Sequence, residues 1–120
     1  MERWLLVVET NCTDPSREKE FHQWYNNTHI PDLLSIPGVL CATRYQNPNP
    51  GEKQGRFLAL YDVETKDILQ TMVTLNDNMT KWGEQGRVPK FVEIVSGCFY
   101  RQIAAPVKRS SKTITCTEAA

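Results

Sequence analysis

The segment from Glu20 to Asp32 reads EFHQWYNNTHIPD, and no other stretch of this 120-residue chain holds as much usable chemistry. Both histidines of the protein, His22 and His29, lie in it, beside the adjacent aromatic residues Trp24 and Tyr25. Aromatic and titratable side chains gathered in this way are typical of one wall of a small-molecule pocket. We therefore expect this segment to organise both the fold and the site.

The segment is predicted to form a helix, a break and the start of a second helix. Apolar spacing at i, i+3, i+4 and i+7 marks one helical face, and the residues in these positions are Phe21, Trp24, Tyr25 and Thr28. The first helix is expected over residues 16–27, because the pair Asn26-Asn27 suits a helix end. Thr28 is expected to cap the second helix, with Pro31 in its first turn, where a missing N–H costs nothing.

The whole chain predicts the element order strand, helix, strand, strand, helix, strand. Strands are expected over residues 3–10, 39–46, 56–63 and 91–103, and the second long helix over 65–75 with a further turn around Met79 and Trp82. This order is that of the ferredoxin-like βαββαβ fold of the α+β class, a four-stranded antiparallel sheet with helices on one face. Residues 1–103 are expected to form this domain, and residues 104–120 a tail that is either flexible or laid on a partner subunit.

The strands are predicted to be apolar on both faces. In the second strand one face is expected to carry Val39, Cys41, Thr43 and Tyr45 and the other Leu40, Ala42 and Arg44. In the last strand the two sets are Phe91, Val95, Gly97 and Phe99 against Val92, Ile94, Cys98 and Tyr100. Helices can cover only one face, and a large open apolar face needs a cover. We therefore expect a homodimer that packs sheet against sheet.

Composition excludes several classes of protein. The 14 basic and 14 acidic residues give no net charge, which argues against binding to nucleic acid or an anionic membrane. The N-terminal residues do not form a signal peptide and no apolar run is long enough to span a bilayer, so we expect a cytoplasmic protein. The cysteines are scattered, which predicts free thiols and no metal site; they are Cys12, Cys41, Cys98 and Cys116.

Several short motifs of this chain resemble those of a known family. Trp24-Tyr25, His29 to Leu34, Pro37-Gly38-Val39 and Arg44-Tyr45 form a pattern that resembles the signature region of the EthD-like family of dimeric α+β barrel proteins. The resemblance implies the ferredoxin-like dimer already expected. It also implies lyase-type chemistry, such as dehydration or decarboxylation of aromatic or polyketide-like compounds, without metal or organic cofactor. Related barrels include isomerases and cofactor-free monooxygenases, and the histidine carried over as functional is His29.

The two central catalytic candidates are His29 and Tyr25. A histidine at the N-terminus of a short helix has its pKa lowered by the helix dipole, so the neutral imidazole can act as a base at pH 7. The alternative is a junction histidine that only bonds a backbone carbonyl. Tyr25 is expected one turn away on the same side, where its phenol either orients the imidazole or donates to a developing oxyanion. Otherwise it is a core aromatic.

Arg44 is the third catalytic candidate, because it is a charge in an apolar row and needs a partner. That partner is either a substrate carboxylate or enolate, or one of the acids Glu9, Asp62 and Glu93. Asp32 either orients His29 or is an ordinary first-turn acid. The further substrate-binding candidates, each with a purely structural alternative, are Trp24, Tyr45, Tyr61 and His22.

The sequence thus predicts an enzyme of lyase or isomerase type that uses histidine acid–base catalysis on an aromatic or polyketide-like compound, in degradation or secondary metabolism. We expect no cofactor, since the chain lacks a Gly-rich phosphate loop, a Gly-x-Ser-x-Gly elbow and a His-Glu-x-x-His helix. The alternatives are a cofactor-free monooxygenase on the same fold and a non-catalytic ligand-binding or stress-response module. The expected partners are a small-molecule substrate and a second copy of the chain.

Overall fold

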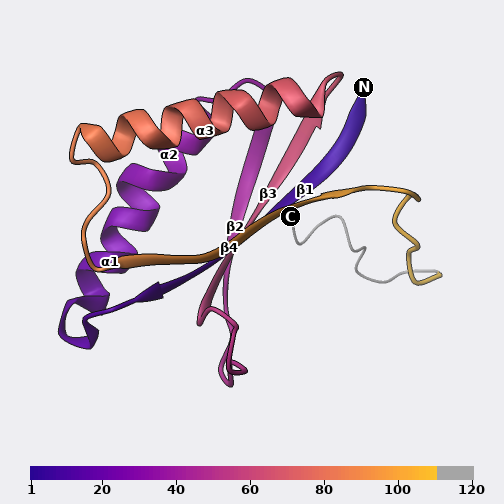
Figure 1. The fold of residues 1–120 in the computed structure, drawn as a ribbon. Coiled ribbons are helices and arrows are strands. Elements are labelled where there is room, and N and C mark those ends of the chain that lie inside the picture. The colour runs from indigo at the N-terminus through magenta and orange to yellow at the C-terminus, as the bar shows by residue number, and fades with distance from the viewer. Residues whose placement is uncertain (111–120) are drawn as a thin grey trace.

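The computed structural model describes residues 1–110 and has the predicted element order (Figure 1). Its elements are β1 (Glu2–Cys12), the 3-10 turn η1 (Pro15–Arg17), α1 (Glu18–Trp24), the π-helical turn η2 (Tyr25–His29), α2 (Ile30–Leu34), β2 (Val39–Gln46), β3 (Phe57–Thr65), α3 (Ile68–Glu84) and β4 (Val92–Arg101). The strands form one antiparallel sheet in the order β2-β3-β1-β4. This confirms the ferredoxin-like fold class.

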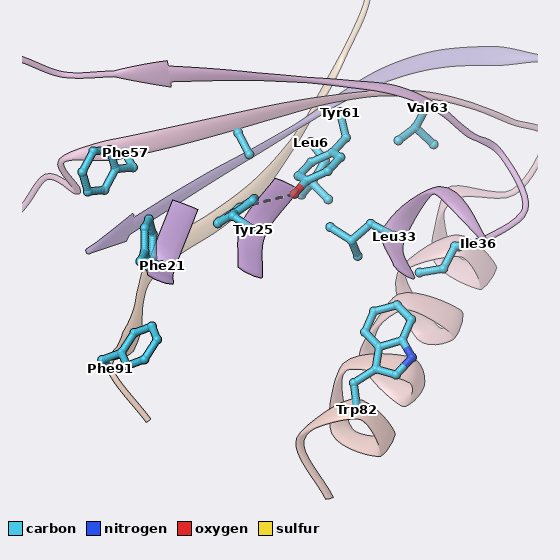
Figure 2. Close-up of a cluster of buried hydrophobic side chains, with 11 residues drawn as sticks. Leu6, Phe21, Tyr25, Leu33, Ile36, Phe57, Tyr61, Val63, Trp82 and Phe91 are labelled. Atoms are coloured by element: carbon cyan, nitrogen blue, oxygen red, sulfur yellow. Dashed lines mark hydrogen bonds between the residues drawn. The ribbon is translucent and has the colours of Figure 1, made fainter. Parts of the chain in front are cut away.

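The covered face of the sheet is set by alternation along β3. Every second residue of this strand is buried, namely Phe57, Ala59, Tyr61 and Val63. Phe21 and Tyr25 from the first helical segment complete the same core (Figure 2), and Figure 1 shows the helices gathered on one side of the sheet. The sequence pattern therefore fixes which face of β3 the helices cover.

The first helical segment is continuous, so the predicted Thr28 cap and break were wrong. His29 has helical backbone angles (φ −70°, ψ −48°) and makes no side-chain cap. The turn is widened instead, because the Ile30 N–H donates to the Tyr25 carbonyl five residues earlier. Pro31 has no N–H, and its ring would crowd the carbonyl four residues before it in a regular α-helix. A π-helical turn just ahead of Pro31 relieves this conflict.

The π-helical turn aligns the buried side chains of this segment. Its buried residues fall at regular intervals of four, at Phe21, Tyr25, His29 and Leu33. In a regular α-helix of 3.6 residues per turn, such a row drifts around the axis by about 40° at each step. The wider turn cancels part of that drift. His29 therefore stays on the face that packs toward the sheet.

Two register shifts change the predicted strand faces. The pairing of β2 with β3 shifts between Val39 and Cys41, so Val39 packs against the core while Leu40 is 52% exposed. The pairing of β1 with β4 shifts between Glu9 and Thr10. Glu9 pairs with Ser96 and Thr10 pairs with Ile94, so Val95 has no partner on β1 and forms a bulge. The alternation predicted through both strands was therefore wrong beyond these points, because a bulge reverses the facing of the residues that follow it.

The second helix is longer than predicted. α3 runs unbroken to Glu84, so Met79 and Trp82 belong to it, and its N-cap is Asp67, whose carboxylate accepts from the Gln70 N–H. In the chain's C-terminal part, residues 104–110 are exposed and have no regular secondary structure, and the rest of the predicted tail lies outside the described residues.

Two smaller expectations concern thiols and membranes. Cys12, Cys41 and Cys98 are free, as predicted, whereas Cys116 lies outside the described residues. Within residues 1–110, no helix has the length and apolar character needed to cross a membrane.

Candidate active site

A cavity of about 490 Å³ lies between the helices and the strands β1 and β4. Its walls come from β1 (Leu6, Val8, Thr10), the first helical segment (Trp24, Tyr25, His29, Leu33), α3 (Met72, Leu75, Asn76, Met79), the following loop (Val88) and β4 (Val92, Ile94, Gly97, Phe99). Most of these side chains are apolar, and only a few polar groups reach the cavity. Such a lining suits a small, largely apolar ligand that is oriented by a few polar contacts.

His29 lines this cavity, and it is only 6% exposed. Its ring stacks on Trp24 (centroids 4.6 Å apart, 21° between planes) and meets the Tyr25 ring edge-on at 5.1 Å. Among the described residues, neither ring nitrogen of His29 has a hydrogen-bond partner. The nitrogens are not fully buried either, because the described residues contain only one fully buried side-chain N or O atom without a partner, and that atom is Arg44 Nε. The His29 nitrogens therefore remain accessible from the cavity, and the aromatic rings hold the imidazole in place.

Burial lowers the pKa of His29 from 6.5 to about 4, although the nearby charge of Asp32 acts in the opposite direction. The expected direction agrees, but the expected cause was wrong, because a continuous helix has no N-terminus at His29. Desolvation disfavours the imidazolium instead. At pH 7 the cavity therefore contains a neutral imidazole that can accept a proton or donate one N–H.

Tyr25 lines the cavity beside His29 and is 1% exposed. Its hydroxyl accepts a hydrogen bond from the Tyr61 hydroxyl at 3.3 Å, drawn as the dashed line in Figure 2. Because Tyr61 uses its proton in this bond, the Tyr25 proton stays available for a ligand oxygen. Burial raises the pKa of both phenols. Tyr61 does not line the cavity, and it acts on the site through Tyr25.

Arg44 lies on the covered face of the sheet but outside the cavity lining. Its guanidinium donates to Asn26 Oδ1 (3.1 Å), lies 3.0 Å from His22 Nδ1 and sits 4.3 Å above the Tyr25 ring centroid. Burial lowers the pKa of this guanidinium. Arg44 is thus a neighbour of Tyr25 that does not itself line the cavity.

The acids expected as partners of Arg44 are bonded elsewhere. Glu9 accepts from Gly55 N–H and Ser96, Asp62 from Cys41, and Glu93 from Asn11. The positive charge of Arg44 therefore meets only neutral acceptors and aromatic faces among the described residues.

The other sequence candidates divide between the cavity wall and the outside. Trp24 lines the cavity, and its indole N–H donates to the Arg87 carbonyl at 2.7 Å. Asp32 forms a bidentate pair with the Arg87 guanidinium at 2.9 Å for both bonds rather than orienting His29. His22 is half-buried outside the cavity, with its Nε2 3.6 Å from Glu18, and Tyr45 is 48% exposed on the open face of the sheet.

Sequence reasoning missed Thr10, Asn76 and Arg87. Thr10 continues the alternation of Leu6 and Val8 along β1, so the strand period could have placed it on the cavity face. Asn76 falls four residues after Met72 and three before Met79, on the helical stripe that lines the cavity. Arg87 has no local sequence signal, because its partners lie more than 50 residues away. The described residues contain no cluster of His, Cys, Asp and Glu that could hold a metal ion.

Comparison with curated proteins gives one informative relative, and no protein-family model matches the chain. The chain is 32% identical over 84 residues to core atranone cluster (CAC) protein 1 of Stachybotrys chlorohalonatus. This similarity covers 66% of the present chain and 36% of that protein. The chain thus spans only about a third of the length of this relative.

Several solved structures share the fold. HapK from Hahella chejuensis aligns with a TM-score of 0.62 at 11% identity, over 89% of this chain and 99% of that one. A dimeric ferredoxin-like protein from an uncultured marine organism gives 0.56 at 12% identity (88% and 99% covered). An EthD family protein from Bacillus halodurans gives 0.53 at 18% identity (86% and 100% covered). The fold implied by the EthD-like resemblance is therefore confirmed.

Proposed function

Starting from the fold that this chain shares with an EthD family protein, we propose that it is a cofactor-independent enzyme of lyase or isomerase type. Its substrate would be a small, largely apolar ring compound bearing oxygen. The observation that carries the proposal is the neutral, unbonded His29 imidazole facing an apolar cavity of about 490 Å³. A base without a protein partner, placed where a ligand fits, is suited to proton transfer.

The proposed reaction begins with His29 removing a proton from a carbon next to a substrate carbonyl. The Tyr25 hydroxyl donates to the carbonyl oxygen, which takes up the negative charge as an enolate. Burial makes the free imidazole a weak base, but an enolate beside it stabilises the imidazolium and raises the His29 pKa as the proton moves. The imidazolium then returns the proton to another carbon in an isomerisation, or to a departing hydroxyl in a dehydration.

Arg44 would assist through Tyr25 rather than by touching the substrate. A cation 4.3 Å from the centroid of a phenol ring favours negative charge on that ring, and it lowers the Tyr25 pKa against the effect of burial. The Tyr25 hydroxyl becomes a stronger donor for that reason. We assign Arg44 a positioning and electrostatic role.

The curated relative supports a place in secondary metabolism. Its name assigns that protein to an atranone cluster, and we extend to this chain only the class of a small natural product as substrate. A carbonyl group in such a compound would supply the acidic neighbouring carbon–hydrogen bond that the mechanism requires.

The test is to incubate the protein with a panel of oxygenated ring compounds and to read the product by mass spectrometry. Loss of water or a rearranged isomer of unchanged mass would support the proposal, provided that His29→Gln abolishes the change. Conversion that persists in His29→Gln would remove the base from the mechanism.

The same measurement decides between the alternatives. A cofactor-free monooxygenase would use the same carbanion but would consume oxygen and add its mass to the product. A non-catalytic binding module would leave every compound unchanged and would bind it equally well after His29→Gln.

We also propose a homodimer formed through the open face of the sheet. The half-buried apolar residues Leu5, Val7, Leu58 and Leu60 lie at its centre, and Tyr45 and Tyr100 are about half exposed beside them. Burying such a face against a second copy is favourable. Light scattering should give twice the 13.8 kDa chain mass, and Leu60→Asp should halve it, whereas a monomeric wild type would contradict the proposal.

A further inference from the structure

The cavity contains a polar group that the proposed chemistry leaves unused, the hydroxyl of Thr10. Thr10 lines the cavity and is only 3% exposed. The Oγ1 atom of Thr10 makes no hydrogen bond within residues 1–110. It is not fully buried, because Arg44 Nε is the single fully buried side-chain N or O atom without a partner in this part of the chain. The hydroxyl therefore retains contact with the cavity space. A buried hydroxyl without a partner is costly unless a ligand or water satisfies it.

Thr10 lies at the opposite end of the cavity from His29. On β1, Leu6 is opposite Tyr61, whose hydroxyl reaches Tyr25, whereas Thr10 is opposite Phe57. Four residues along a strand separate these two points by about 13 Å. Figure 2 shows Phe57 and Phe91 at one end of the core and Leu33 and Trp82 at the other, and His29 contacts Trp82 with 6.5 Å between ring centroids.

The β-bulge places apolar side chains around Thr10. The register shift between Glu9 and Thr10 brings Ile94 opposite Thr10, and Val92 and Ile94 both line the cavity there. Without the shift, regular alternation would place Val95 on the same face as Gly97 and Phe99. Ile94 is 50% exposed, whereas Thr10 beside it is 3% exposed. Bulges commonly re-aim side chains next to sites, and here the result is a hydroxyl enclosed by apolar walls.

We propose that Thr10 is a specificity-determining residue that hydrogen-bonds a second oxygen atom of the ligand, at the end remote from the His29–Tyr25 pair. The inference rests on the proposed function. It narrows the ligand class to elongated ring compounds with oxygen substituents at both ends. One oxygen meets Tyr25, the apolar ring system fills the space beside Leu6, Val8 and Phe99, and the distal oxygen meets Thr10.

The test compares 2-naphthol, with one oxygen, and 2,6-dihydroxynaphthalene, with oxygens at opposite ends, by calorimetric titration of the full chain. The wild type should bind the diol about fivefold to tenfold more tightly, the effect of one added hydrogen bond. Thr10→Val has nearly the same shape and suits a strand, and it should abolish this preference while leaving the 2-naphthol affinity unchanged. Thr10→Ser keeps the hydroxyl and should keep the preference. Thermal melts of both variants confirm that they fold.

Each remaining outcome is decisive. If the wild type binds both compounds equally, or if Thr10→Val weakens both to the same extent, the role of Thr10 is refuted while the cavity remains a ligand site. If neither compound binds to the wild type, the proposed substrate class fails as well, and the inference falls with it.

Discussion

The two histidines of this chain lie seven residues apart on one helical segment, yet their surroundings are opposite. His22 is half-buried on the outer side, where its Nδ1 lies 3.0 Å from the Arg44 guanidinium and its Nε2 lies 3.6 Å from Glu18. His29 is 6% exposed, packs against the rings of Trp24 and Tyr25 and lines a cavity. One imidazole is engaged by polar side chains, and the other is free for a ligand.

A polar partner, and not the residue type, therefore decides whether a histidine in this chain is free to react. Arg44 donates to His22 Nδ1 only while that nitrogen is unprotonated, so the outer imidazole is committed to the scaffold. The π-helical turn between the two histidines turns His29 inward, away from Arg44 and Glu18. The comparison can be tested by removing each imidazole, by titration and by changing the turn.

The largest expected effect comes from replacing each histidine by glutamine. His29→Gln should lower kcat/KM at least a hundredfold on a substrate found by the mass-spectrometric screen, since general-base groups contribute about 10²- to 10⁴-fold. The matched variant His22→Gln should stay within about threefold of the wild type, because an outward side chain is remote from the proton transfer. Equal losses in both variants would show that the two sites are not functionally distinct.

The burial of His29 should be visible in the pH dependence of stability. The pKa of His29 is about 4 in the folded chain and 6.5 as its ordinary value, so the unfolded chain binds the proton more readily between these values. The contribution of neutral His29 to the free energy of unfolding is therefore fully present above pH 6.5. It decreases as the pH falls from 6.5 through 4. The loss between pH 7 and pH 4 is about 3 kcal/mol.

Urea unfolding of the wild type and of His29→Leu at both pH values measures this contribution. The variant should lose less stability on acidification, by about the same 3 kcal/mol. A His29→Leu profile parallel to the wild type would mean that His29 titrates normally.

The smallest expected effect concerns the π-helical turn. Pro31→Ala restores an N–H and removes the ring, so the turn can relax toward a regular α-helix and rotate His29 relative to the cavity. We expect about a tenfold lower kcat/KM, within the range for a small misplacement of a catalytic group, with an unchanged or higher Tm. Pro37→Ala, outside the helix and the cavity, is the control. Full activity in Pro31→Ala would show that the turn is not needed.

Parts of the site could be predicted because they depend on local spacing. The interval of four between Tyr25 and His29 predicted that both lie on one helical face. The neutral state of His29 was predicted for the wrong reason. The prediction relied on a helix N-terminus at His29, whereas the pKa is lowered by burial, which arises only when the elements pack together. The partners of Arg44 and Asp32 could not be predicted, because hydrogen bonds between distant segments leave no periodic signal.

The sequence alone predicts the element order and shows the concentration of aromatic and titratable residues in the segment from Glu20 to Asp32. These features follow from short-range periodicity, which any chain with this pattern must satisfy to bury its apolar side chains. The tertiary structure was needed to show which histidine is free, where the β-bulge redirects β4 and that Ile94 instead of Val95 lies opposite Thr10. Such features depend on how separate elements meet, because a backbone shift of one residue exchanges the side chain that faces a site.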